Sequence, residues 1–354
     1  MKLCILGNGI TSLSLASYLV NQGINVDLFF EKKKLLKNAS RTIGISKKNL
    51  DFFNKNILDI NKFVWNIKEI DIFSDNLQSE RILNFKKKNH ILFSIIKNDK
   101  LYELLLSKLK KNKLFTNRVK KNFHIKDYNL VINCDGNSDI TKKFFFKKIK
   151  KNYNSLGYTV ILKHKEIKNN YVASQIFTKN GPLAFLPIST KETSVVYSIK
   201  GNKKLNLKNL IKKYNTKYSI KSFSEFGSSQ LKSINLRTYY YKNILAFGDL
   251  LHRIHPLAGQ GFNMSLRDIK NLSKLIKHKL DHGLELDSSI CKDFENKTRH
   301  KNFLFTTGID SIYEFFNLES KIKNKFLSRS VQFIGKNKFL NKTLEKIANN
   351  GLVI

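Results

Sequence analysis

The segment Ile244–Asp268, ILAFGDLLHRIHPLAGQGFNMSLRD, constrains the fold more than any other part of this sequence. It opens on four apolar residues, which predict a short buried strand, and Gly248 and Asp249 then place a carboxylate where that strand ends. Ligands of open α/β folds bind at this edge of the sheet. His255-Pro256 predicts an extended turn, because a proline pushes the preceding residue out of the helical region.

A glycine-bearing loop and a helix complete the segment. Gly259 and Gly261 carry no Cβ, so the backbone there can approach a ligand closely. From Phe262 onward the apolar residues recur at helical spacing. The amino terminus of such a helix offers unbonded N–H groups and a partial positive charge, which together suit an anion. The segment therefore predicts a strand, an acidic turn, a glycine loop and a helix around one ligand.

A second glycine motif, near the N-terminus, predicts a βαβ unit. The strand-like KLCIL is followed by Gly7, Gly9 and Ser12, then by an apolar helical face, and then by a strand that ends at Glu31. In such a fingerprint the glycines permit a tight turn and close approach of a pyrophosphate, and the acid accepts hydrogen bonds from ribose hydroxyls. Ser12 replaces the usual third glycine but is still small. Glu31 favours FAD or NAD over a 2′-phosphorylated nucleotide.

These motifs resemble a known family. GD-x5-HP-x-AGQG-x-N is very similar to the second FAD-binding motif of the class A flavoprotein monooxygenases, and its details look most like the aromatic-ring hydroxylases of ubiquinone biosynthesis. The resemblance implies that Gly248 and Asp249 bind FAD, with Asp249 on the ribityl chain. It also implies that the following loop lies against the isoalloxazine. The residues assigned to that loop are Pro256, Gly259, Gln260, Gly261, Phe262 and Asn263.

Two further stretches resemble cofactor-binding parts of the family. Arg41 lies in Ser40–Ile45, where the family has an arginine that contacts the cofactor, although a solvated loop charge explains Arg41 equally well. Asp135 and Gly136 follow a strand-like run and resemble the Asp-Gly motif near the FAD pyrophosphate, which is implicated in the use of a nicotinamide cofactor. The family continues with a serine and an arginine at set spacing, whereas here Ser138 comes early and Lys142 or Lys143 occupies the basic position.

The run Gly181–Pro187, GPLAFLP, resembles the segment in which the family's substrate sheet faces the flavin. The resemblance places Phe185 and Pro187 at the substrate site. A strand pair with a proline-capped turn is the simpler interpretation, and both can hold together.

We therefore expect an α/β fold: a Rossmann-like FAD-binding domain (glutathione-reductase-like, PHBH-type) with an inserted mixed β-sheet substrate domain and C-terminal helices. The FAD-binding domain is expected to be discontinuous, formed by residues 1–60, 91–150 and 233–290. Residues 61–90 and 151–232 are expected to form the substrate-binding sheet, and residues 291–354 the helical region.

Composition narrows the class of protein. The formal net charge of +38 comes from lysines spread along the whole chain, which favours a codon bias over a nucleic-acid surface; attraction to an anionic membrane surface stays open. Three widely spaced cysteines favour a reducing cytoplasm over a disulfide framework. We expect a cytoplasmic protein, with a peripheral position at the inner face of the membrane or in a biosynthetic complex as the alternative. No nucleic-acid partner is expected.

We read His252 and His255 as loop-shaping residues and expect no metal site, since a third ligand is missing.

The resemblance implies an FAD-dependent monooxygenase that hydroxylates an aromatic ring of a polyprenylated phenol or benzoquinol in ubiquinone biosynthesis, using O2 and NADH or NADPH through a flavin C4a-hydroperoxide. No protein residue is assigned as a catalytic acid or base, because the cofactor carries the chemistry. Two alternatives stay open: an FAD-dependent oxidoreductase of another small aromatic or isoprenoid, and a non-catalytic flavoprotein scaffold of a biosynthetic complex.

Overall fold

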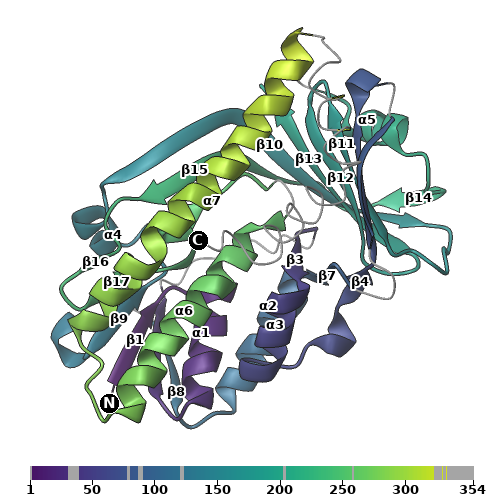
Figure 1. Ribbon diagram of the computed structural model, residues 1–354. Coiled ribbons are helices and arrows are strands. Elements are labelled where there is room, and N and C mark those ends of the chain that lie inside the picture. Colours follow the sequence, from purple (N-terminus) through teal and green to yellow (C-terminus); the bar gives the residue numbers. More distant parts are fainter. Residues whose placement is uncertain are drawn as a thin grey trace.

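The computed structural model contains a parallel sheet, a large mixed sheet and a small antiparallel sheet, with helices packed between and around them (Figure 1). It describes residues 2–30, 40–77, 80–86, 91–119, 123–201, 205–256, 259–322, 329 and 332.

The parallel sheet has the strand order β16-β17-β9-β1-β2-β8. Its strands are β1 (Lys2–Leu6), β2 (Asn25–Phe30), β8 (Phe115–Val119), β9 (Leu130–Asn133), β16 (Tyr240–Tyr241) and β17 (Ile244–Ala246). All run parallel to their neighbours except β16, which pairs with β17 in the antiparallel direction. The central strands β1, β9 and β17 are buried almost throughout. Helices cover both faces of a parallel sheet, which explains why these strands are continuous apolar runs.

The helices α1 (Ile10–Asn21), α3 (Asn98–Lys110) and α6 (Gly261–Asp281) pack on this sheet. Their buried leucines and isoleucines join the apolar residues of the strands in one hydrophobic cluster. The chain has its largest core here, directly beneath the glycine motifs.

The large sheet has the order β18-β15-β10-β13-β12-β11-β5-β6, with β14 paired to β10. Its strands are β5 (Glu69–Ser74), β6 (Arg81–Lys86), β10 (Lys148–His164), β11 (Val172–Thr178), β12 (Gly181–Pro187), β13 (Glu192–Lys200), β14 (Ile220–Phe223), β15 (Gly227–Leu236) and β18 (His252–Arg253). Only β11 and β5 pair in the parallel direction among its described strands. The helix α5 (Leu207–Tyr214) packs on one face and encloses a second hydrophobic cluster.

A small sheet of β3 (Thr42–Ser46), β7 (Phe93–Lys97) and β4 (Trp65–Ile67) connects the two larger ones, and α2 (Lys47–Asn56) follows β3 directly. A hydrogen bond of 2.8 Å joins the hydroxyls of Thr42 and Ser194. The Nζ of Lys97 donates to Glu192 at 2.9 Å. These contacts tie the small sheet to β13 and so place the large sheet relative to the parallel one.

The helix α7 (Ser288–Ile322) runs across both halves of the molecule, from the parallel sheet to the large one (Figure 1). Near its start Phe294 packs against Phe247 beside the parallel sheet. Near its end Phe316 stacks on Phe177 of β11 at 3.5 Å between ring centroids. The expected packing of this helix on the flavin domain is therefore only half of its role, because it also closes one face of the large sheet.

The α/β fold class with a second, mixed sheet and a C-terminal helix is confirmed. The domain boundaries stay a prediction; β18, within 233–290, pairs with β15 of the large sheet. The final apolar stretch 344–354 lies outside the described residues. None of the helices in the described ranges is both long enough and apolar enough to cross a membrane.

Candidate functional site

Three loops meet at the carboxyl edge of the parallel sheet, because β9 lies between β1 and β17. Gly7 follows β1 with a φ of +102°, a conformation that side chains rarely adopt. A Cβ added there would lie 3.3 Å from the backbone N of Asp135 and 3.4 Å from the carbonyl carbon of Cys134. The loop after β1 thus contacts the loop after β9, and a glycine is required for that contact.

The amino terminus of α1 is open to a ligand. Gly9 is its N-cap, and no side chain caps the first turn. The first hydrogen bond of the helix runs from the N–H of Leu13 to the carbonyl of Gly9, which leaves the preceding N–H groups for an external acceptor. Nothing lies within 4 Å of a Cβ built on Gly9. This arrangement suits a phosphate group.

Ser12, the departure from the third glycine, is buried. Its Oγ lies 3.5 Å from the position of a Cβ on Gly7. Ser12 therefore packs close to the Gly7 turn as a small buried side chain.

Asn133 and Thr141 both form hydrogen bonds with the Asp135-Gly136 loop. The N–H of Asp135 donates to Asn133 Oδ1 at 3.1 Å, and the hydroxyl of Thr141 donates to the carbonyl of Asp135 at 2.6 Å. Ser138 is the N-cap of α4 (Asp139–Phe144) and accepts from the N–H of Thr141. Ser138 is thus a helix cap, and Gly136 is exposed at the edge of the site.

Gly248 and Asp249 follow β17 at the same edge. Gly248 has a φ of +66°, and a Cβ there would lie 3.0 Å from Cγ2 of Thr11 in the first turn of α1. Asp249 itself is exposed. The strand-edge carboxylate predicted from the sequence therefore lies beside the loop that opens α1, and is free to accept hydrogen bonds from a ligand.

Asn263, in the first turn of α6, forms hydrogen bonds to other protein groups through both the oxygen and the nitrogen of its side-chain amide. Its Nδ2 donates to the carbonyls of Gly44 and Gly259. Its Oδ1 accepts from the N–H of Ser46 and from Asn49, both at 2.9 Å. Because all four hydrogen-bonding positions are taken, Asn263 joins β3, α2 and the glycine loop, and positions a ligand only through them.

Gln260 is the N-cap of α6 and is only 7 % exposed. Its Oε1 has no hydrogen-bond partner among the described residues. The adjoining Gly261 has nothing within 4 Å of an added Cβ, and Gly259 has a φ of +62°. The start of α6 therefore offers a second open helix terminus.

His252 and His255 both shape the loop that leads to α6. His252 Nε2 and Asp268 Oδ2 are joined at 2.5 Å, and Asn302 of α7 donates to the other oxygen of Asp268 at 3.1 Å. His255 packs between Tyr153 and Tyr313, with ring centroids 4.9 Å and 4.3 Å away. Burial lowers the pKa of His255 to about 3, so its imidazole is neutral. Asp268 and Asn302 carried no sequence signal, because they come from two separate helices.

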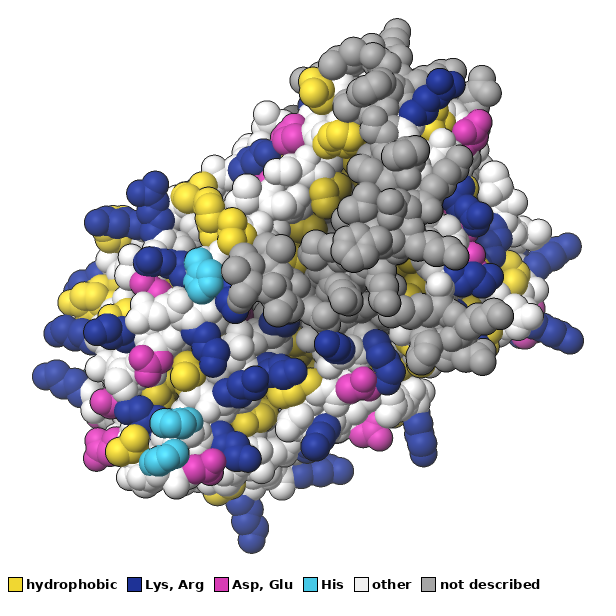
Figure 2. Space-filling model, in the orientation of Figure 1, with side chains coloured by type: hydrophobic (Ala, Val, Ile, Leu, Met, Phe, Trp, Pro, Cys, Tyr) yellow, Lys and Arg dark blue, Asp and Glu magenta, His cyan; other side chains and the backbone are white. Residues whose placement is uncertain are grey.

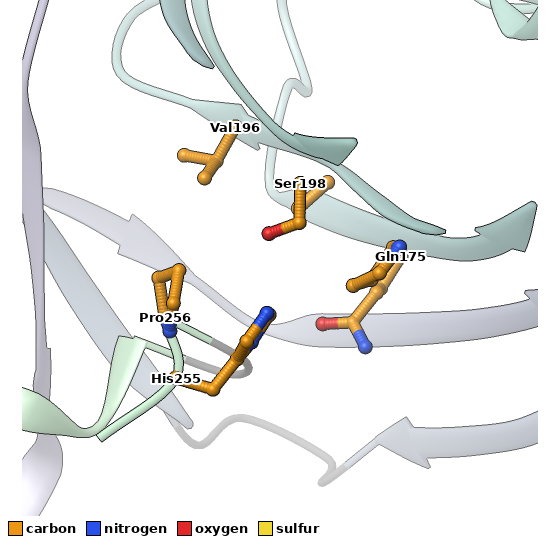
Figure 3. A pocket seen from close by; sticks show the side chains of 7 residues that line it. Gln175, Val196, Ser198, His255 and Pro256 are labelled. Atoms are coloured by element: carbon orange, nitrogen blue, oxygen red, sulfur yellow. The ribbon is translucent and has the colours of Figure 1, made fainter. Parts of the chain in front are cut away.

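A hollow lies between this loop and the large sheet. It is partly open to solvent, has a cavity volume of about 20 Å³, and is lined by Gln175, Pro182, Ala184, Val196, Ser198, His255 and Pro256. Figure 3 shows Gln175 of β11 and Val196 and Ser198 of β13 facing the His255-Pro256 turn across this space. Pro256 therefore belongs both to the loop that leads to α6 and to the wall of the hollow.

Phe185 and Pro187, expected at the substrate site, are on the other face of β12. Phe185 is buried in the cluster with α5 and lies near Tyr218. Side chains alternate along a strand, so Pro187 shares the face of Phe185, and the residues that reach the hollow are Pro182 and Ala184. Neither residue lines this hollow, and their assignment to the substrate stays a prediction.

Two assigned residues contribute less. Arg41 is exposed, and its backbone carbonyl accepts a hydrogen bond from the N–H of Asn98 at the start of α3. This contact does not test whether the Arg41 side chain binds the cofactor, so that role stays a prediction. Glu31 lies outside the described residues. No group of three or more metal-ligating side chains occurs in the described ranges.

Basic side chains cover the visible face without gathering in one block (Figure 2). Many are paired locally, for example Lys47 with Asp51 on α2 and Arg299 with Glu295 on α7. This spread is consistent with the interpretation of the lysines as a general bias of the sequence.

Known proteins support a common family. The sequence profile of squalene epoxidase matches residues 127–337, more than half of the 354-residue chain. The chain is 24% identical over 242 residues to the ubiquinone biosynthesis monooxygenase COQ6 of Danio rerio, covering 56% of this chain and 49% of that protein. It is 28% identical over 153 residues to 3-demethoxyubiquinol 3-hydroxylase of Escherichia coli, covering 40% of this chain and 39% of that protein. The matched part thus spans about half or less of the length of these relatives.

Solved structures share the fold. The p-nitrophenol 4-monooxygenase PnpA of Pseudomonas putida has a TM-score of 0.77 at 12% identity, covering 99% of this chain and 98% of that chain. Klebsiella pneumoniae HpxO, solved with FAD and uric acid, has a TM-score of 0.75 at 12% identity, covering 99% and 97% of the two chains. Because the squalene epoxidase profile matches more than half of the residues, the chain belongs to the squalene epoxidase family of FAD-dependent monooxygenases.

Proposed function

We propose that this protein is an FAD-dependent monooxygenase that hydroxylates the aromatic ring of a polyprenylated phenol or benzoquinol in ubiquinone biosynthesis. The observation that carries the proposal is that one loop, His255-Pro256, leads into the open start of α6 and also walls the hollow under the large sheet. A cofactor at the strand edge and a small ring at the open side of the hollow would therefore meet across this loop.

The residues at the strand edge fit FAD. The open turn at Gly9 would hold the pyrophosphate, and the exposed Asp249 would accept from the ribityl hydroxyls. The Gly259–Gly261 backbone would lie along the isoalloxazine, held in place by Asn263. Glu31 is proposed for the ribose on sequence grounds alone. The relatives named for ubiquinone biosynthesis support the pathway, and HpxO supports the cofactor.

When bound, FAD would supply electron transfer and activation of O2. The protein's part is to hold the ring and to keep water away. The buried His255 is neutral, so the hollow carries no charge on that wall. The positive end of α6 would face negative charge on the reduced cofactor. NADH or NADPH is proposed as the electron donor, with the Asp135-Gly136 loop beside its approach.

A peripheral position at the inner face of the membrane accords with the net charge of +38 and with a lipid-soluble substrate. A second candidate, an FAD-dependent oxidoreductase of a smaller polar aromatic, is favoured by one observation. A second hollow, which shares Pro182 with the first, is bordered by Lys179, Asn180 and Lys200. Mass spectrometry of products from a substrate panel separates the candidates, because hydroxylation adds one oxygen atom and reduction adds two hydrogens.

The visible spectrum of gently purified protein, with identification of the flavin released on denaturation, is the first test. We expect flavin bands and FAD; a colourless protein that also fails to bind added FAD would overturn the proposal. A Gly9→Ala variant locates the site, because the added methyl group enters the open space of the α1 turn. We expect about tenfold weaker FAD binding, on the order of 1.4 kcal/mol, with an unchanged melting temperature.

The matched control is Gly308→Ala on α7, where an added Cβ also meets nothing within 4 Å. It should leave FAD affinity unchanged. Equal FAD affinity in the two variants would place the cofactor elsewhere.

A further inference from the structure

Helix α7 contacts the His255-Pro256 turn through two buried tyrosines. The imidazole of His255 packs between the rings of Tyr153 of β10 and Tyr313 of α7, whose centroids lie 4.9 Å and 4.3 Å from its own. The two tyrosine rings meet each other edge to face at 5.0 Å. Their exposed fractions are only 5 % and 6 %. The ring of His255 is therefore enclosed by side chains from two distant segments of the chain.

Hydrogen bonds fix both tyrosines in place. The hydroxyl of Tyr153 donates to the carboxylate of Asp310, which lies one turn before Tyr313 on the same face of α7. The hydroxyl of Tyr313 is joined to that of Ser155 at 3.1 Å. Burial, and next the hydrogen bond to Asp310, raise the pKa of Tyr153, whereas a backbone hydrogen bond from His255 lowers it. The Tyr153 hydroxyl thus contacts both the helix and the turn.

A β-bulge in β10 lies where this strand meets α7. The pairing of β10 with β15 changes register within residues 152–156, and Asn154 has a φ of +49°. Asparagine adopts this left-handed conformation more readily than most residues. The two neighbours of Asn154, Tyr153 and Ser155, both contact Tyr313. Because a bulge bends its strand and redirects side chains, we interpret it as the local feature that aims both residues at the helix.

The same helix supports the rest of the loop that leads to the turn. His252 bonds to Asp268, which also accepts from Asn302 of α7. Ile254 lies in one hydrophobic cluster with Phe305 of α7. Together with the tyrosine contact at the second histidine, the buried side chains of this loop all pack on α7 or on a residue bonded to it. The position of the loop therefore depends on α7.

We propose that Tyr153 and Tyr313 are positioning residues, which set the orientation of the imidazole they enclose and through it the place of Pro256 beside the cofactor. Asp310 takes part by holding Tyr153. The proposal rests on the function proposed above, because the backbone that follows this turn is the part proposed to lie along FAD. It gives α7, a helix outside the glycine motifs, a direct influence on the geometry of the flavin site.

Hydrogen exchange tests the contact with or without bound FAD. Through easier local opening, we expect the amides of residues 253–255 to exchange about fivefold faster in Tyr153→Phe and in Tyr313→Phe than in the wild type, the usual effect of one net hydrogen bond. Asp310→Leu should behave like Tyr153→Phe. Asp310→Asn keeps an acceptor for the Tyr153 hydroxyl and should stay within about twofold of the wild type.

The visible circular dichroism of bound flavin is the second readout, because it reports the surroundings of the isoalloxazine and not the stability of the fold. We expect its bands to change in Tyr153→Phe and in Tyr313→Phe. In Asp310→Asn they should keep the wild-type shape.

Tyr214→Phe is the matched control. The hydroxyl of Tyr214 donates to Asp75 at 2.8 Å, and this tyrosine is 7 % exposed in the cluster against α5. The variant thus removes the same kind of tyrosine–carboxylate bond in another part of the molecule. It should lower the melting temperature as Tyr153→Phe does, and leave both the exchange at residues 253–255 and the flavin spectrum unchanged.

Wild-type exchange together with a wild-type flavin spectrum in both Tyr153→Phe and Tyr313→Phe overturns the proposal. An equal change in Tyr214→Phe also overturns it, because any loss of stability would then loosen the turn. A change in Asp310→Asn as large as that in Asp310→Leu contradicts the part given to Asp310. A wild type that binds no FAD contradicts the proposed function instead, and the exchange rates, which need no cofactor, still decide whether the tyrosines hold the turn.

Discussion

The carboxyl edge of the parallel sheet and the inner face of the large sheet are built differently. The edge depends on backbone: Gly7, Gly248 and Gly259 all have positive φ, and the first two allow loops to come into contact. The inner face depends on side chains, where Ala184 and Ser198 are short and Gln175 is polar. A backbone requirement restricts the residue type strongly, whereas a side-chain patch can be built from many combinations.

This difference explains which region could be recognised. Glycine is nearly the only residue for a positive φ at a close approach, so a nucleotide edge leaves a local signature. The hollow leaves none, because its lining comes from three strands and a loop that are distant in the sequence. Successive side chains of a strand lie on opposite faces, so a shift of one residue changes which side chains line the hollow.

Gly181 tests this comparison most strongly, because it lies in the large sheet and yet its backbone conformation requires glycine. It has a φ of +130°, and a Cβ there would lie 2.2 Å from the carbonyl oxygen of Ser198. We expect Gly181→Ala to abolish stable folding, a loss on the order of 4 kcal/mol or more. Denaturant unfolding of the expressed protein measures it.

The control is Gly201→Ala at the end of β13, which has a φ of +77° but no neighbour within 4 Å of an added Cβ. It should cost about 1–2 kcal/mol, the strain of a left-handed residue alone. Equal stability of the two variants would mean that the contact with Ser198 is unimportant and that the large sheet tolerates backbone change.

Asp268 tests the contacts that connect the two regions. Asp268→Ala leaves His252 and Asn302 buried without their shared partner. Removing one member of a buried pair of this kind costs about 3–5 kcal/mol, and we expect that loss in the free energy of unfolding.

Glu166→Gln removes one member of an exposed ion pair with Lys191 and should cost less than about 0.5 kcal/mol. A loss below 1 kcal/mol for Asp268→Ala would show that the buried contact is not what holds the loop to α6.

The pH dependence of stability tests the burial of His255. Its pKa is lowered by burial to about 3 in the folded protein, against an unfolded value of about 6.5. Between these values the unfolded chain binds the extra proton, so stability falls as the pH drops from 6.5 toward 3. The contribution is on the order of 3 kcal/mol between pH 6.5 and pH 4.

His255→Asn should remove that part of the slope, which unfolding curves at several pH values will show. The carboxylates, including Asp310 near Tyr153, titrate in both proteins, and so cancel in the difference. Identical slopes for the variant and the wild type would contradict the buried, neutral state of His255.

Much of the fold could be predicted from local pattern. The strand–glycine–helix order at residues 3–20 and 244–276 corresponds to β1, α1, β17 and α6, and it suffices for the α/β class. The segment Gly181–Pro187, for which a strand pair with a proline-capped turn was the simpler interpretation, is a single strand, β12. Which face of that strand lines the hollow could not be predicted, because the segment is apolar on both faces and its sequence periodicity carries no contrast.

The sequence by itself determined the family, the fold class and the glycine positions of the strand edge, because these depend on backbone geometry that few residue types permit. Only the tertiary structure decided that Asn263 is a clamp, that Ser138 is a helix cap, that Asp268 joins β18 to α6 and α7, and that Ala184 rather than Phe185 faces the hollow. Each of these depends on which distant segments pack together, and that is set by burial of the whole chain and not by local residue pattern.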